Sequence, residues 1–435
     1  MMPKNTGSLP GKGGTGVYQP SEKNRERFQA LAALPAVRTA LELIERDQDR
    51  CIEEQCELTC IEAPTGSEEK RAGVFAEKLR ALGLEDVHID RNGNVVALRR
   101  GRGGGPKVVI EGHLDTVFPF GTVTGVERRD GFLYAPGIGD DTRALAMLLS
   151  LVRAMNEAGI ETAGDVVIVG TAREEGVGSL GGMKDFLADN GDIEAALSVD
   201  NHDMGEIGYQ ATSGETWEIR FSGQGGHAFG AFGSISQPLH AAARAVAKIA
   251  DIEVPEQPKT SYCVSNFHSG NDAGVHAIAS EAVIKLNFRS NSVQEFEKLK
   301  AKIFDAVEAA CREETERWGK NAVCCEKKLI GSMPGGGQDA DSPLVQAAWL
   351  SLEYLGVTPS LSKGGCTNAN VAIAKGIPAL CIGRAWAPDA ESRKSYNHSL
   401  DERYPIAGAY KPVQQALLVL LSAAGVYGAV DSVLK

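Results

Sequence analysis

Apolar and polar positions along the chain alternate between short apolar runs and longer stretches with helical periodicity. Residues 24–60 carry apolar positions at helical spacing, which predicts helix. Further on, apolar runs at 107–111, 165–171 and 195–199 predict buried strands, with a shorter strand at 95–98 and helices at 142–157 and 180–188. Because strands covered on both faces are continuously apolar, this alternation predicts an α/β fold with a mainly parallel sheet and helices on both faces.

The pattern changes after about residue 211. Alternating segments predict strands at 215–222, 260–268, 281–288 and 322–330, and helical segments lie at 236–251 and 293–317. This order, βαββαβ, is the ferredoxin-like plan and predicts an inserted domain. After residue 337 the first pattern resumes, with predicted helices at 343–355, 368–374 and 407–424 and a strand at 379–382.

These changes in pattern predict the domain organisation. A chain of 435 residues is longer than one ordinary core accommodates, so two domains are expected. The predicted segments are a flexible N-terminal tail (1–23), the first part of the α/β domain (24–211), the inserted domain (212–330) and the second part of the α/β domain (331–435).

Charge and cysteine usage narrow the class of protein. A formal net charge of −12 argues against nucleic acid or an anionic membrane as a partner. The first 20 residues lack the apolar core of a secretory signal, no stretch is apolar enough to span a membrane, and nine scattered cysteines suit reduced thiols. We therefore expect a cytoplasmic protein. A metal cluster at Cys51, Cys56 and Cys60 is disfavoured, because these residues lie in a helical stretch and their spacing fits no zinc-finger pattern.

Acidic and imidazole side chains follow the predicted strands, at the edge where function collects in parallel sheets. The candidates are His113 and Asp115, Asp140 in a Gly-rich turn, Glu174 and Glu175, Asp200, and His398 near the C-terminus.

Each candidate has an ordinary alternative when it is taken alone. His113 and Asp115 can be a surface pair, Asp140 can cap the following helix, and Glu174 with Glu175 can form a solvated acidic turn. Asp200 and His398 fit simple turn and loop positions, respectively. Their conjunction favours a metal site, because two imidazoles and several carboxylates suit zinc, manganese or cobalt.

Five ordered motifs connect these residues to a known family. The motifs are GHLDTV (112–117), PGIGDDT (136–142), AREEGVGS (172–179), SVDN (198–201) and YNHS (396–399). From about residue 50 to the C-terminus, the chain resembles the co-catalytic zinc exopeptidases and deacylases that include peptidase T, carboxypeptidase G, aminoacylase and succinyl-diaminopimelate desuccinylase. The resemblance implies a catalytic α/β domain and an inserted lid and dimerisation domain.

The resemblance also implies a role for each candidate. His113 and His398 would bind different metal ions, Asp140 would bridge both ions, and Glu175 and Asp200 would bind one each. The ions would be two divalent cations, zinc above all, with cobalt or manganese as alternatives. Asp115 would hydrogen-bond the His113 ring, Glu174 would be the general base, and the peptide bond after Asp140 would be cis.

In the inserted domain the resemblance points to residues that would contact substrate. His227, within GQGGHAFGAFGS, would reach into a partner subunit's site and stabilise an oxyanion; its alternative is a surface histidine. Arg289 would hold a substrate carboxylate; its alternative is a strand-end salt bridge. The chain departs from the family at His276 and Asn368, where relatives often have asparagine and aspartate, and both positions are expected to hold substrate.

The resulting hypothesis is a metallopeptidase acting on small peptides. A water bridging two metal ions, with Glu174 as general base, would cleave di- or tripeptides as an exopeptidase, in a homodimer. The alternative within the same chemistry is a deacylase or desuccinylase of N-acyl amino acids. A non-catalytic binding protein on the same fold is disfavoured, because Glu174 and all five expected ligands are present.

Overall fold

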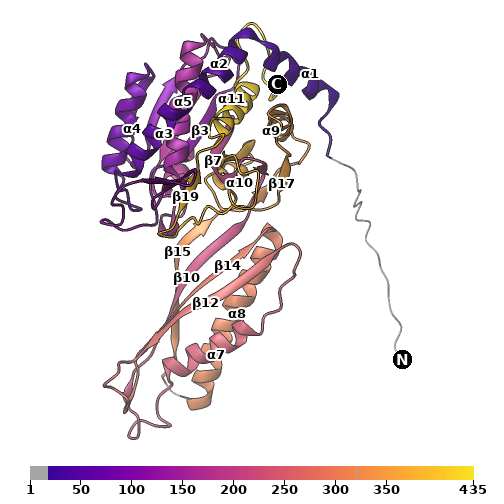
Figure 1. Cartoon of the computed structure of the whole chain (residues 1–435). Coiled ribbons are helices and arrows are strands. Elements are labelled where there is room, and N and C mark those ends of the chain that lie inside the picture. Colours follow the sequence, from indigo (N-terminus) through magenta and orange to yellow (C-terminus); the bar gives the residue numbers. More distant parts are fainter. Residues whose placement is uncertain (1–17, 320) are drawn as a thin grey trace, which may run out of the picture.

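The computed structural model describes residues 18–319 and 321–435. Figure 1 shows two bodies, a large one in which helices surround a sheet and an elongated small one in which helices lie along a sheet. The chain enters the small body through β10 (Ser213–Ser222) and leaves it through β15 (Cys324–Met333). We call these two parts the large body and the small body.

The large body is built on an eight-stranded sheet. Its order is β1 (Glu85–Ile89), β2 (Val95–Arg99), β6 (Val166–Thr171), β3 (Val108–His113), β7 (Ala195–Asp203), β18 (Ala379–Ala385), β8 (Glu206–Gly208) and β17 (Ser360–Ser362). The central strands β6, β3, β7 and β18 are parallel, whereas β2 and β8 join them in antiparallel pairing. The predicted mainly parallel sheet is therefore confirmed.

Helices cover both faces of this sheet because successive strand residues point to opposite sides. Ile110 of β3 packs in a core with α5 (Thr142–Glu157), α9 (Pro343–Tyr354) and α11 (Tyr410–Ala424). Its neighbour Val109 packs on the other side with α6 (Gly181–Asp189) and α10 (Ala369–Ala374). Helix α4 (Glu69–Ala81), which the sequence analysis missed, adds Phe75 to the first core.

The helix predicted over 24–60 is three helices, so that prediction was wrong in its continuity. They are α1 (Glu22–Ala33), α2 (Pro35–Arg46) and α3 (Gln48–Thr59). Pro35 disfavours helical backbone at the preceding residue, and Leu34 is extended with φ −60° and ψ 130°. Most of the predicted tail, residues 1–17, lies outside the described residues; its last part overlaps α1, whose first turn is capped by the Ser21 side chain.

The small body has the ferredoxin-like plan that the sequence predicts. Its sheet order is β12 (Thr260–Ser269), β14 (Glu281–Ser290), β10 and β15, all antiparallel. Helices α7 (Pro238–Ala250) and α8 (Val293–Trp318) pack on one face around a core of their own, which includes Ile284, Phe288 and Ile303. Ser292 caps the start of α8, and Gly319 ends it with a positive φ of 68°.

Several short strands were not predicted, because two or three residues carry no measurable periodicity. They are β4 (Glu127–Arg129), β5 (Phe132–Tyr134), β19 (Arg403–Pro405), β9 (Gln210–Ala211), β16 (Gly336–Gly337), β11 (Gly226–His227) and β13 (Ala277–Ile278). The pair β9–β16 joins the segment just before the small body to the segment just after it. Over the described part of the chain, no helix combines the length and apolar character needed to cross a membrane.

The separate cores predict separate responses to a core mutation. Ile303→Ala removes a fully buried side chain of the small body and should lower its free energy of unfolding by about 2–5 kcal/mol. Amide hydrogen exchange should then speed up in β10, β12, β14 and α8 while α5 stays protected. Val293→Ala, at an exposed position of the same helix, is the matched control. Equal loss of protection in α5 would show that the two cores unfold as one unit.

Candidate metal centre

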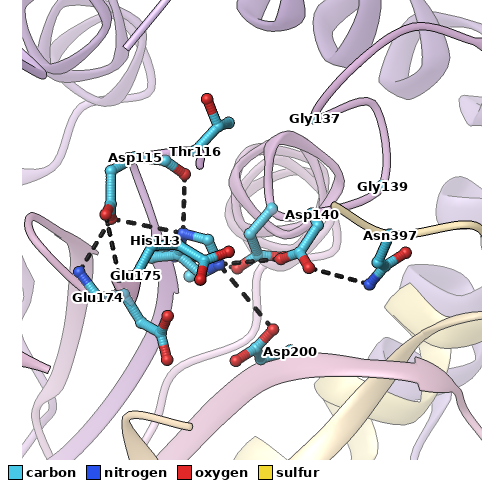
Figure 2. Close-up of polar contacts among 12 residues, drawn as sticks. His113, Asp115, Thr116, Gly137, Gly139, Asp140, Glu174, Glu175, Asp200 and Asn397 are labelled. Atoms are coloured by element: carbon cyan, nitrogen blue, oxygen red, sulfur yellow. Dashed lines mark hydrogen bonds and ion pairs between the residues drawn. The ribbon is translucent and has the colours of Figure 1, made fainter. Parts of the chain in front are cut away.

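The candidate side chains meet where neighbouring parallel strands end. His113 is the last residue of β3, Glu174 and Glu175 follow β6, and Asp200 lies in β7, the neighbour of β3 on its other side. Asp140 comes from the Gly-rich turn before α5. Figure 2 shows Asp140, Glu175 and Asp200 grouped around the His113 ring.

The Asp140 carboxylate lies between two imidazoles. Its Oδ1 is 3.0 Å from His113 Nε2, and its Oδ2 is 3.4 Å from His398 Nε2. On the outer sides, His398 Nε2 lies 2.8 Å from Glu175 Oε1, and His113 Nε2 lies 3.9 Å from Asp200 Oδ1. The Asp140 carboxylate thus belongs to two groups of ligand atoms, one with His113 and Asp200 and one with His398 and Glu175. This arrangement suits a pair of metal ions.

The donor set fits divalent cations. His113, Asp140 and Glu175 each offer one ligand atom within 4.8 Å of the others, and so do His113, Asp141 and Asp200. Asp141 was not among the expected ligands. Its Oδ2 accepts the His113 N–H at 2.9 Å, while its Oδ1 is buried without a hydrogen-bond donor among the described residues. Imidazole nitrogens with carboxylate oxygens are the donors that zinc, manganese and cobalt bind.

Crowded carboxylates dominate the electrostatics of the site. Hydrogen bonds with Asp140 and Glu175 raise the pKa of His398 from 6.5 to about 10. Burial lowers the pKa of His113, but the nearby Asp141, Asp115 and Asp140 outweigh it and bring that pKa well above its usual value. Positive charge is therefore strongly favoured here, as a cation site requires.

Asp115 supports the site in a different way from the expected one. The His113 Nδ1 bond is made to the backbone carbonyl of Asp115 at 2.9 Å, and the Asp115 carboxylate is farther away, at 3.5 Å. That carboxylate accepts the backbone N–H groups of Glu174 and Glu175, both at 3.0 Å, and the Thr65 hydroxyl at 2.8 Å. The Asp115 carboxylate thus positions the backbone after β6, and the Asp115 carbonyl orients the His113 ring at the end of β3.

Glu174 lines the cleft beside the candidate ligands. Its carboxylate accepts no hydrogen bond from any residue in the described ranges, whereas Glu175 faces His398. Burial raises the pKa of Glu174 well above its ordinary value, and the charges of Asp200, Glu175 and Asp115 add to this effect. A carboxyl group with a raised pKa and a free oxygen is suited to accept and return a proton.

Two residues that the sequence analysis did not single out hold Asp140 in place. Glu402, fully buried, accepts the backbone N–H groups of Gly137, Gly139 and Asp140, each at 2.9 Å. Asn397, from the YNHS motif, donates to Asp140 Oδ2 at 2.9 Å (Figure 2). The Asp140–Asp141 peptide bond is cis, as the resemblance predicts.

Arg384 is the second unexpected participant. It is 1 % exposed, in strand β18, and its guanidinium faces three carboxylates. The distances are 2.6 Å to Asp200 Oδ1, 3.3 Å to Asp140 Oδ2 and 3.5 Å to Asp141 Oδ1. Burial lowers the pKa of Arg384, but these charges raise it by more, so the side chain is a fixed cation. Its signal in the sequence is a lone arginine in the apolar strand ALCIGRA.

A cleft of about 590 Å³ runs between the metal centre and the small body. His398, Glu174 and Glu175 line it on one side, and Arg289 and Asn287 of β14 line it on the other. The Arg289 Nε donates to Asn287 Oδ1 at 3.1 Å, and no carboxylate among the described residues forms an ion pair with this arginine. The predicted alternative, a strand-end salt bridge, is therefore not formed.

The other predicted substrate-binding residues lie elsewhere. His227 and His276 are both exposed, and neither lines the cleft. Their segments are held together by the β11–β13 pair and by a hydrogen bond from the Ala228 N–H to the His276 carbonyl. Asn368 is 1 % exposed and donates to Glu111 Oε2 at 2.9 Å and Thr171 Oγ1 at 2.8 Å. The Nδ2 group of Asn368 is therefore engaged in a buried network, whereas its Oδ1 is buried without a hydrogen-bond donor among the described residues.

Comparison with known proteins places this geometry in a family. The model of peptidase family M20/M25/M40 matches residues 109–422. The chain belongs to peptidase family M20/M25/M40. It is therefore a metal-dependent hydrolase of amide bonds, and the metal site described above is the candidate centre of that chemistry.

Named relatives of this M20 chain include both deacylating and peptide-cleaving proteins. Succinyl-diaminopimelate desuccinylase of Leptothrix cholodnii is 30% identical over 53% of this chain and 66% of its own length. The protein of the same name from Bordetella avium is 27% identical over 80% of this chain and 93% of its own. A tripeptidase of Staphylococcus aureus has a similar fold, with a TM-score of 0.71 at 22% identity over 87% of this chain and 98% of that one.

The role of Arg384 can be tested by thermal unfolding with and without metal. In the metal-free protein, Arg384→Met should lower the free energy of unfolding by about 3–5 kcal/mol, because the buried Asp140 and Asp141 and the partly buried Asp200 lose their cation. Added zinc should then raise the unfolding temperature of Arg384→Met by more than it raises that of the wild type. The zinc-induced shift of Arg384→Lys, which keeps the charge, should fall between the shifts of the wild type and of Arg384→Met. Equal zinc-induced shifts would contradict the role of Arg384 as the internal counter-ion.

Proposed function

We propose that this M20 chain is an exopeptidase that hydrolyses di- or tripeptides with two divalent metal ions, zinc above all. The observation that carries the proposal is the shared position of Asp140 between His113 and His398, with Glu175 and Asp200 on the outer sides. We assign His113, Asp140, Glu175, Asp200 and His398 as the ligands of the two ions. Bound ions would supply Lewis acidity that activates water near neutral pH.

Glu174 is assigned the proton transfers. Its carboxylate lines the cleft, lies next in sequence to Glu175 and is free of hydrogen bonds among the described residues. It would accept a proton from the attacking water and return it to the leaving amine. Asp115 would keep this residue in place, since it holds the backbone N–H of Glu174 at 3.0 Å.

Arg289 is assigned to the substrate carboxylate. It lines the cleft opposite Glu174, and its guanidinium is not neutralised by an acidic side chain in the described ranges. A planar guanidinium binds a carboxylate through two parallel hydrogen bonds, which would orient a short peptide toward the metal ions.

The second candidate function is hydrolysis of N-acyl amino acids. It has specific support, because the two relatives found by sequence, from Leptothrix cholodnii and Bordetella avium, carry the name succinyl-diaminopimelate desuccinylase. The two functions share the metal site and Glu174 and differ in what the cleft holds. A substrate panel of dipeptides, tripeptides and N-acyl amino acids separates them, and turnover of the acyl compounds alone would overturn the peptidase proposal.

We further propose that the small body is a lid and a dimerisation domain, over residues 212–330. Exposed apolar side chains gather on the segment that carries His227, where Phe229 is 92% and Phe232 is 68% exposed. A second copy that covers them would bring His227 to its partner's cleft. The domain boundary at 330 falls inside β15, so the change of body lies nearer to Met333.

Nine free cysteines also support a reducing, cytoplasmic location.

The base assignment predicts a clear separation between metal binding and turnover. Glu174→Gln should bind zinc with wild-type stoichiometry but lose about 10²–10⁴-fold in kcat, because the amide cannot accept the proton. Metal analysis and peptide assays on the same sample measure both quantities. Glu42→Gln, at an exposed position of α2, is the control. Wild-type turnover by Glu174→Gln would show that another group is the base.

The dimer assignment predicts complementation between two inactive variants. His227→Ala and Glu174→Gln should each be inactive alone. Mixed dimers contain one site with both an intact Glu174 and a partner's intact His227, so equal mixing should restore about a quarter of the wild-type rate. Sedimentation and differential tags confirm that mixed dimers form. Mixed dimers without activity would refute the exchange of His227 between subunits.

A further inference from the structure

A second cavity of about 460 Å³ adjoins the active-site cleft. Lys259, Arg289 and Lys363 line it, and no acidic side chain does. Arg289 and Cys366 line both cavities, so the second one continues from the first past the guanidinium. We call this second cavity the basic pocket.

The strand register of the small body gathers the side chains on one wall. Ser261 of β12 lies opposite Arg289 of β14, and the Asn291 N–H donates to the Lys259 carbonyl at 3.0 Å. Because alternate residues of a strand share a face, Lys259 and Ser261 lie on the same side of the sheet as Arg289 and Asn291. All four line the basic pocket.

The opposite wall is a loop of the large body that is fastened to this sheet. The Gly365 N–H donates to Thr212 Oγ1 at 3.1 Å, and that hydroxyl donates to Asn291 Oδ1 at 2.6 Å. Gly364 packs so closely on the same amide that a Cβ there would lie 2.6 Å from Asn291 Oδ1. These contacts hold Lys363, the residue before Gly364, at the pocket.

Within the described residues, no acidic side chain neutralises the three cations of the basic pocket. Several other basic residues of the small body have acidic partners; Lys300 pairs with Glu215 at 2.9 Å and Lys327 with Glu308 at 2.6 Å. Lys259, Arg289 and Lys363 form no ion pair with any residue of the described part of the chain, and the nearest side-chain partners of Arg289 are Asn287 and Cys366. Like charges held in one cavity repel one another unless an anion joins them.

We infer that the basic pocket is a subsite for a second anionic group on the substrate. This inference rests on the proposed function and makes it more specific. Arg289, at the junction of the two cavities, would bind the carboxylate next to the scissile amide. Lys259 and Lys363 would bind a further carboxylate carried by the same amino acid. The preferred substrates are therefore short peptides or N-acyl compounds that end in a dicarboxylic amino acid.

Matched substrates that differ in one charge test this subsite. Ala-Glu and Ala-Gln, and N-acetyl-Glu and N-acetyl-Gln, have nearly the same shape within each pair. The wild-type enzyme should favour the glutamate member in kcat/KM by at least about tenfold. Lys259→Met and Lys363→Met should each reduce this preference by about fivefold and leave kcat/KM for the glutamine member unchanged, since exposed lysines contribute modestly. Lys375→Met, an exposed lysine that lines neither cavity, is the control.

A binding measurement separates this inference from the proposed function. Calorimetry with zinc-loaded Glu174→Gln should give a lower Kd for Ala-Glu than for Ala-Gln, and the two lysine substitutions should remove the difference. Equal Kd values for Ala-Glu and Ala-Gln in Glu174→Gln with both lysines intact would overturn the subsite. This conclusion would hold even if the wild type hydrolyses both peptides. A lysine-dependent difference in Kd without hydrolysis of any of the four compounds would support the subsite and overturn the proposed function.

Discussion

The arrangement of this molecule around its candidate metal centre follows from mutual repulsion among crowded carboxylates that are buried or nearly so. Asp140 and Asp141 come from one turn, Glu175 follows β6 and Asp200 lies in β7. Positive charge must lie among these four carboxylates for the fold to hold. Two imidazoles and the guanidinium of Arg384 supply part of it. The negative charge that remains unbalanced makes the site suitable for divalent cations. The repulsion that would destabilise the metal-free fold therefore also favours metal binding.

Fixed backbone geometry around Asp140 makes this balance possible. Glu402 accepts three N–H groups of the turn, and Asn397 donates to the Asp140 carboxylate, so the shared ligand is held by residues more than 250 positions away in the sequence. Asp115 does the same for the segment after β6. Because these supports come from two segments far apart in the sequence, the correct placement of the ligands depends on the completed fold.

Much of the fold could be predicted from the sequence, because long periodic segments carry strong signals. Helix 142–157 and the buried strand runs were recognisable from their apolar patterns, as was the βαββαβ order of the small body. The break at Pro35 was missed, since the apolar spacing continues through it. Short strands such as β9 and β16 were missed because pairing with distant segments, and not local sequence, creates them.

The candidate ligands were found because they follow strands within recognisable motifs. Arg384 and Glu402 were not singled out, because their importance depends on contacts with residues far away in the sequence. Asn368 shows a different limit: the motif position predicts substrate contact, and only the fold shows that its side chain also donates to Glu111 in the interior.

The pairing of β9 with β16 has a consequence for the history of the chain. Ala211 and Gly336 lie side by side, so the two ends at which the small body is attached are neighbours. An insertion whose ends meet can be lengthened, exchanged or lost with little disturbance of the host fold, because a short turn could close the gap. The part of the enzyme that we propose to contact substrate is thus free to diverge, while the part that carries the candidate metal site keeps its geometry.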